Sequence, residues 1–153
     1  MRLTSYDALH AFAQQLARRI DSSEFHTKVV VTPSSVSEKG VVIKVSLLKT
    51  FIENRPIAAR TTRTLRVRVS VAGTAESMTG LQQALAAIES LDRYLLSDDL
   101  RLESPDGEDI PNSRIIQAIS QEDSFIDNPD STAVQDVQDD RIITITIPEG
   151  ADT

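Results

Sequence analysis

One stretch of the chain alternates strictly between apolar and polar side chains, and this alternation limits the fold more than any other feature. The apolar positions are Leu65, Val67, Val69 and Val71, and the polar ones are Thr64, Arg66, Arg68 and Ser70. A period of two is typical of a strand that buries one face and exposes the other. Residues 60–72 are therefore predicted to form a sheet strand that ends at Gly73, with Thr74 as the N-cap of a following helix.

Two segments have the apolar spacing of amphipathic helices. Thr4 and Asp7 form a predicted capping box ahead of a helix over 5–20. The apolar stripe of this helix is expected to comprise Tyr6, Leu9, Ala13, Leu16 and Ile20, with Phe12 beside it. A second helix is predicted over 75–96, and its apolar side comprises Met78, Leu81, Leu85, Ile88, Leu91 and Leu95.

The remaining segments complete an α+β pattern. Further strands are predicted over 27–32, 41–48 and 141–147, with a short strand within 114–120. The connection 49–62 is too long for a simple turn, so it is either a long hairpin arm or a loop that packs on another surface. The polar, acidic segment 121–140 is predicted to be a mobile loop.

The element order α-β-β-β-α-(β)-β predicts one domain over 1–153 of the α+β class. Hairpin-compatible strands favour a mostly antiparallel sheet of about four to five strands, with both helices packed on one face.

Charge is distributed unevenly along the chain, whose net charge is −7. Residues 97–140 contain thirteen acids and two bases, a net charge of −11, so the remainder carries +4. Much of the positive excess lies within 49–68, where Lys49 and five arginines accompany one acid, Glu53. A chain polarised in this way is suited to packing head to tail with its own copies, and equally to folding its acidic arm over its basic strand.

The sequence carries no motif for catalysis or for a cofactor. Cysteine is absent, and the five glycines are too scattered for a phosphate-binding loop. His10 and His26 have no partner at metal-ligand spacing, no calcium-loop pattern is present, and no G-x-S-x-G elbow occurs. We therefore expect a protein that is not an enzyme and binds neither cofactor nor metal. Apolar runs are short, which predicts a cytoplasmic protein without membrane contact.

The arginines of the alternating strand are the candidate binding residues. Arg66 and Arg68 are expected on one face about 7 Å apart, and Arg60 or Arg63 would extend the stripe. Three interpretations stay open: an ordinary solvent-facing side, a subunit interface that meets acidic groups, and nucleic-acid contact. The net negative charge and the scarcity of aromatic residues argue against specific nucleic-acid binding.

The arrangement of the whole chain resembles a known family. An amphipathic helix is followed by Val29 to Pro33, a hydrophobic strand, and the strand Arg63 to Val71, which turns at Gly73 into a long helix. A short strand, a connector with Phe125, Ile126 and Asp127, and the strand Arg141 to Ile147 complete the series. This order resembles the tail terminator, or tail completion, proteins of long-tailed bacteriophages and prophages, including the Mu-like group.

The resemblance implies a virion structural protein, assembled in the host cytoplasm, at the head-proximal end of the tail. Its copies would form a ring, typically a hexamer, that binds the tail tube protein, ends tube growth and offers a docking surface to the head-tail connector protein. DNA would pass through the ring without being bound specifically. The acidic segment 121–140 is longer than the connectors expected for the family, and it would line this lumen.

Residues of the basic strand and the preceding arm are the expected subunit or tube interface. They are Phe51, Ile52, Arg55, Ile57, Arg60, Arg63, Arg66 and Arg68. Two alternatives remain: another tail or neck component, such as a connector or tube-associated protein, and an unrelated cytoplasmic α+β protein-binding module.

Overall fold

A computed structural model describes residues 3–20, 28–32, 40–55, 60–117, 125–126 and 135–148. In chain order its elements are α1 (Ser5–Arg19), β1 (Val29–Thr32), β2 (Val41–Arg55), β3 (Arg60–Ala75), α2 (Met78–Leu95), β4 (Arg114–Gln117), β5 (Phe125–Ile126) and β6 (Gln135–Pro148).

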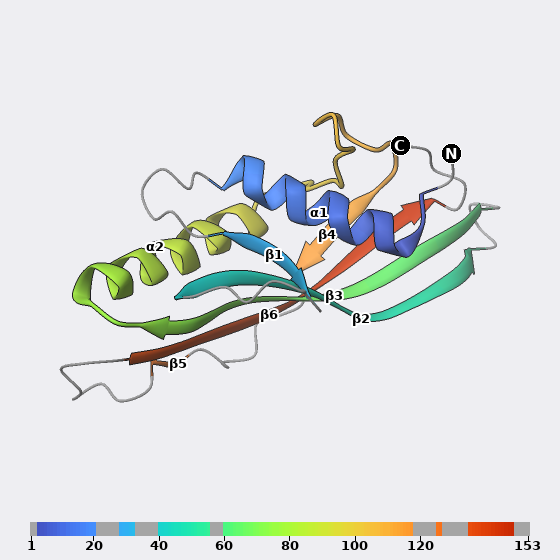
Figure 1. Ribbon diagram of the computed structural model, residues 1–153. Coiled ribbons are helices and arrows are strands. Elements are labelled where there is room, and N and C mark those ends of the chain that lie inside the picture. Colours follow the sequence, from blue (N-terminus) through green and yellow to red (C-terminus); the bar gives the residue numbers. More distant parts are fainter. Residues whose placement is uncertain are drawn as a thin grey trace.

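The strands form one twisted sheet, with both helices on the same face (Figure 1). Its strand order is β1-β2-β3-β6-β4, and β5 pairs with β6. β1 runs parallel to β2, whereas the other pairings are antiparallel. The predicted α+β class, with a mostly antiparallel sheet and helices on one side, is confirmed.

The core lies between the helices and the inward side of the sheet. The alternating apolar residues of β3, Leu65, Val67, Val69 and Val71, are fully buried, as predicted. β6 adds Ile143, Ile145 and Ile147 from the adjacent strand. Because β3 and β6 pair along fourteen positions, their inward side chains form a continuous apolar floor for α1 and α2.

The predicted apolar stripe of α1 is buried at Leu9, Phe12, Ala13, Leu16 and Ile20, whereas the stripe predicted for α2 is only partly buried. The capping box of Thr4 and Asp7 is present, but Tyr6 is 67% exposed. α2 likewise exposes Met78 and Leu85. The buried side of α2 comprises Ala84, Ala87, Leu91 and Leu95. The predicted stripe was wrong at the exposed positions for two reasons. Alanine side chains allow a helix to approach the sheet closely, so alanines can form the buried side. Large apolar residues determine the apparent spacing of a sequence even where they are exposed to solvent.

Gly73 does not end the strand. β3 continues to Ala75, and the N-cap of α2 is Ser77, whose Oγ accepts from Gly80 N at 3.0 Å. Gly73 has φ +146°, and a Cβ there would lie 2.1 Å from the carbonyl oxygen of Gly40. The glycine is needed for a close backbone approach between β3 and the start of β2, which explains why the predicted stop was wrong.

Of the two interpretations of the connection 49–62, the long hairpin arm is correct. β2 and β3 remain paired as far as Arg55 and Arg60, and a register shift occurs between Leu47 and Lys49. Because of that shift, the residues that face the helices change from odd-numbered positions in 41–47 to even-numbered positions in 49–52. A single period of two therefore does not run through the whole strand, and its part after Leu48 was not predicted.

The mobile-loop prediction for 121–140 is wrong where the structure describes this segment. Phe125–Ile126 is a short strand and 135–140 belongs to β6. Asp139 is fully buried, and its Oδ2 lies 2.9 Å from Arg141 Nη2, which also contacts Asp92 Oδ1 at 2.9 Å. Burial raises the pKa of Asp139, and the nearby Arg141 opposes that rise. Backbone pairing with the end of β3 forms this strand despite its polar composition.

Candidate functional site

The face of the sheet opposite the helices carries the candidate binding residues. Arg66 and Arg68 are exposed, and they alternate with the buried residues of β3. They therefore project from the side of the sheet that lies away from α1 and α2.

Strand pairing arranges the side chains of this face in rows across the sheet. One row runs through Lys49, Arg66, Thr144 and Ile116 on β2, β3, β6 and β4. A second runs through Phe51, Thr64, Thr146 and Arg114, and a third through Ser46, Arg68 and Ile142. Neighbouring positions in a row lie about 5 Å apart and the rows about 7 Å apart.

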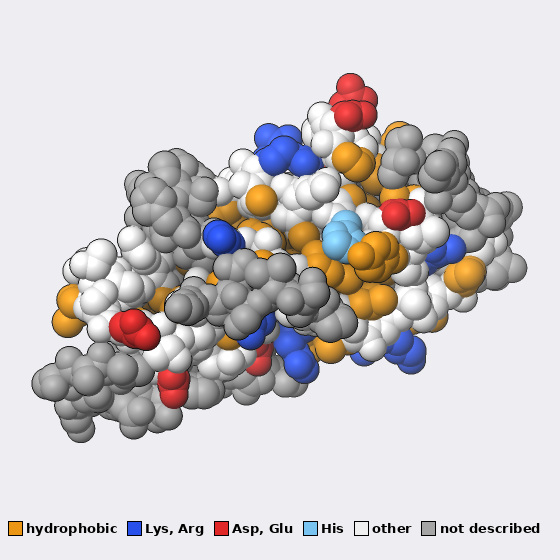
Figure 2. All heavy atoms as spheres, in the orientation of Figure 1, with side chains coloured by type: hydrophobic (Ala, Val, Ile, Leu, Met, Phe, Trp, Pro, Cys, Tyr) orange, Lys and Arg blue, Asp and Glu red, His pale blue; other side chains and the backbone are white. Residues whose placement is uncertain are grey.

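We call Lys44, Lys49, Arg66, Arg68 and Arg114 the basic face. All five side chains are exposed. Within the described part of the chain, none of the five forms an ion pair with a carboxylate. In Figure 2, Lys and Arg side chains gather along the lower edge, below β2 and β3. The register also places Asp140, which is half-buried, in one row with Lys44 and Ser70, so the positive potential of this face is centred on Lys49, Arg66, Arg68 and Arg114.

Lys49 and Arg66 are directly opposite each other on paired strands. Like charges at such positions destabilise a sheet. The Lys49 ammonium lies 5.4 Å from the centre of the Phe51 ring, a contact that partly offsets this repulsion. The arrangement favours an anionic group that binds between the two cations.

The predicted interface residues fall on two faces. Phe51, Arg66 and Arg68 lie on the basic face. Ile52 and Arg63 are cross-strand partners on the helix-bearing side, where an Arg63 Nη donates to the Leu3 carbonyl oxygen at 3.3 Å. Arg63 therefore does not extend the stripe.

The other predicted residues lie at the end of the β2–β3 arm. The backbones of Arg55 and Arg60 pair with each other there. Ile57 lies outside the described residues.

Sequence reasoning missed Arg114 as a member of the basic face, because it is one of the two bases in the acidic segment. Its place follows from the register of β4, β6 and β3, in which Thr146 pairs with both Arg114 and Thr64. A strand predicted within 114–120 indicates that Arg114 and Ile116 share one face, but it does not indicate which strand pairs with it.

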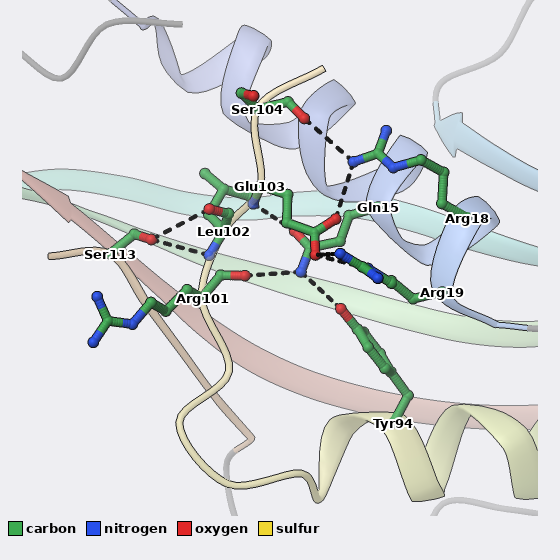
Figure 3. A network of polar contacts seen from close by, with 9 residues as sticks. All are labelled: Gln15, Arg18, Arg19, Tyr94, Arg101, Leu102, Glu103, Ser104 and Ser113. Carbon is green, nitrogen blue, oxygen red and sulfur yellow. Dashed lines mark hydrogen bonds and ion pairs between the residues drawn. The ribbon is translucent and has the colours of Figure 1, made fainter. Parts of the chain in front are cut away.

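A second feature is the loop between α2 and β4, which a polar network holds against both helices (Figure 3). Gln15 of α1 is fully buried at its centre. Gln15 Nε2 donates to Tyr94 Oη at 2.7 Å and to the Arg101 carbonyl oxygen at 2.8 Å, and its Oε1 accepts from Glu103 N at 2.8 Å. Burial raises the pKa of Tyr94, against the lowering effect of its hydrogen bond with Gln15.

Glu103 fixes the same loop to the end of α1 by ion pairs. It is 5% exposed, and its carboxylate contacts Arg18 Nη2 at 3.1 Å and Arg19 Nη2 at 2.7 Å. The hydrogen bond and charge of Glu103 raise the pKa of Arg19. Ser113 Oγ closes the base of the loop, because it accepts from Leu102 N at 3.0 Å and donates to the Ile110 carbonyl oxygen at 2.6 Å.

The described residues contain no group of three or more His, Asp or Glu that could hold a metal ion. No helix in the described ranges is long and apolar enough to cross a membrane. No model of a known protein family matches the chain, and no curated protein matches it.

Proposed function

We propose that the chain is a structural protein of a bacteriophage tail that acts by binding alone. Its copies close a ring at the head-proximal end of the tail tube, end tube polymerisation and provide the docking surface for the head connector. The observation that carries this proposal is the basic face, a built and charged surface on one side of the sheet. The resemblance of the element order to tail terminator proteins supplies the biological setting.

A terminator subunit needs separate surfaces for its ring neighbours, for the tube and for the connector. The basic face is one such surface. The β2–β3 arm is another, because it forms one end of the sheet and exposes Ile52 on the side opposite Phe51 and Arg66. Since these surfaces point in different directions, one subunit can contact two partners at once.

Another tail or neck component would use the same surfaces, and so would an unrelated α+β binding module. The decisive observation is tail length. Deletion of the gene from the phage or prophage that carries it, followed by induction and negative-stain microscopy, should give overlong or headless tails. Normal infectious particles would overturn the proposal for a tail protein, and particles with tails of normal length but a defective head junction would favour a neck component.

Complementation connects this phenotype to the basic face. The wild-type chain should restore normal tails, whereas Arg66→Glu with Arg68→Glu should not. Arg93→Glu is the matched control, because Arg93 is an exposed arginine on α2 whose ion pair is with Glu89 of the same helix. Rescue by the folded double variant would remove the basic face from the function.

A further inference from the structure

We infer that the basic face binds the acidic tip of a second copy of this chain. The acidic tip is the turn 104–109, which exposes Asp106, Glu108 and Asp109 and contains no base. This inference rests on the proposed function in one respect only: it names the subunit contact that builds the ring.

The acidic tip is held in a defined shape. Ser104 N donates to the Glu108 carbonyl oxygen at 2.8 Å, and Gly107 N donates to the Ser104 carbonyl oxygen at 2.9 Å. Arg18 Nη2 also donates to the Ser104 carbonyl oxygen at 3.2 Å. A preorganised turn loses little conformational freedom on binding, which favours its use as a contact surface.

The tip and the basic face lie on opposite sides of the domain. The loop before β4 contacts α1 through Arg18, Arg19 and Gln15, and α1 covers the other face of the sheet. Figure 2 shows Asp or Glu side chains at the top, where Figure 1 places this loop, beside a group of Lys or Arg side chains, and it shows charges of both signs along the lower side. A tip therefore cannot reach the basic face of its own chain, but it can reach that of a neighbour. Such a head-to-tail contact is heterologous, and repeated copies close into a ring when the rotation permits.

The chemistry of the two surfaces is complementary. Arginine guanidinium groups bind carboxylates through paired N–H donors, and Arg66 and Arg68 present two such groups from one strand. A carboxylate between Lys49 and Arg66 would also relieve their repulsion. Ile142, 37% exposed, lies opposite Arg68, and Ile116, 56% exposed, lies one strand beyond in the row of Arg66 and Thr144; both would exclude water from the contact.

A nucleic acid is the other anionic occupant of such a face. A nucleic acid brings a phosphate charge at every nucleotide along its length, whereas a second copy, although its net charge is also −7, brings only the three carboxylates of the tip to the contact. A second copy is therefore the occupant that fits the surface best.

Charge exchange in the purified full-length protein tests the contact. The face variant carries Arg66→Glu and Arg68→Glu, and the tip variant carries Asp106→Lys and Glu108→Lys. Each variant alone should self-associate at least about tenfold more weakly than wild type in sedimentation velocity at low salt. An equimolar mixture should regain association, because the intact tip of one variant meets the intact face of the other. The combined quadruple variant should also associate, and Arg93→Glu should behave as wild type.

Three outcomes would overturn the inference. They are a wild-type chain that stays monomeric at every concentration, a mixture that fails to regain association, and a face that retains a DNA duplex while the protein remains monomeric. Tail length separates this inference from the proposed function. If the mixture regains association but gene deletion leaves tails normal, the subunit contact holds and the tail function does not. If gene deletion gives abnormal tails but the mixture does not regain association, the tail function holds and the subunit contact does not.

Discussion

The buried amide of Gln15 is predicted to contribute more to stability than any other polar side chain of α1. Gln15→Met keeps the length and shape of the side chain but removes its three hydrogen bonds to Tyr94, Arg101 and Glu103. The N–H of Glu103 belongs to a buried residue, and leaving such a donor unpaired costs about 1–3 kcal/mol. The other two partners are partly exposed and can recruit water, so the total loss is about 2–4 kcal/mol.

The chain provides a matched control at the preceding position. Gln14 has the same side chain on the same helix but is exposed, so Gln14→Met should change the free energy of unfolding by less than about 0.5 kcal/mol. Urea denaturation followed by circular dichroism measures both variants. With an unchanged slope, Gln15→Met should lower the midpoint by about 1–2 M. A Gln15→Met midpoint equal to that of Gln14→Met would refute the reasoning that this amide joins α1, α2 and the loop energetically.

Three further predictions follow from single contacts. Gly73→Ala should destabilise the fold by about 3 kcal/mol or more, because the added Cβ would overlap the Gly40 carbonyl. Gly40→Ala meets open space and should cost about 1 kcal/mol. Thermal unfolding compares the two variants, and equal losses of stability would contradict the overlap at Gly73. Arg66→Glu should raise stability by about 0.2–0.5 kcal/mol through attraction to Lys49, and a loss of stability in urea titration would argue against the repulsion. Tyr94 has a pKa raised above its usual value of 10.0, so its stabilising contribution should be complete below pH 10 and lost as pH rises through the folded-state pKa; a Tyr94→Phe variant with the same alkaline loss as wild type would disprove this linkage.

Periodicity was sufficient to predict the centre of the fold. The alternation of Leu65, Val67, Val69 and Val71 requires one buried side, and β3 is buried there. The helices were located correctly and the predicted stripe of α1 is buried except at Tyr6, but the buried side of α2 is shifted, since Ala84 and Ala87 face the sheet while Leu85 does not. The positions of large apolar residues predict that a helix has an apolar side, whereas the distance at which the helix packs on the sheet decides which residues are buried there.

The candidate site was only partly predictable because it depends on strand register. Arg66 and Arg68 are two positions apart on one strand, so the sequence alone places them together. Lys49 lies opposite Arg66 only because of the register shift near Leu47, and Arg114 reaches this face from a strand nearly fifty positions later. These relations require knowledge of the pairing, which local composition does not contain.

Spatial charge separation in this domain differs from the separation along its sequence. The segment with thirteen acids contributes Arg114 to the basic face, Asp139 to the interior beside Arg141, and Glu103 to ion pairs with Arg18 and Arg19. Glu103 engages both arginines at the end of α1, and the carboxylates of Asp106, Glu108 and Asp109 in the neighbouring tip are exposed to a partner. The sheet register places the five cations of the basic face on the side away from the helices, and the tip carboxylates lie on the helix-bearing side, so the proposed head-to-tail contact depends on the tertiary structure. A change at either surface is therefore interpretable only when the Glu103 contacts and the register of β2 and β3 are intact.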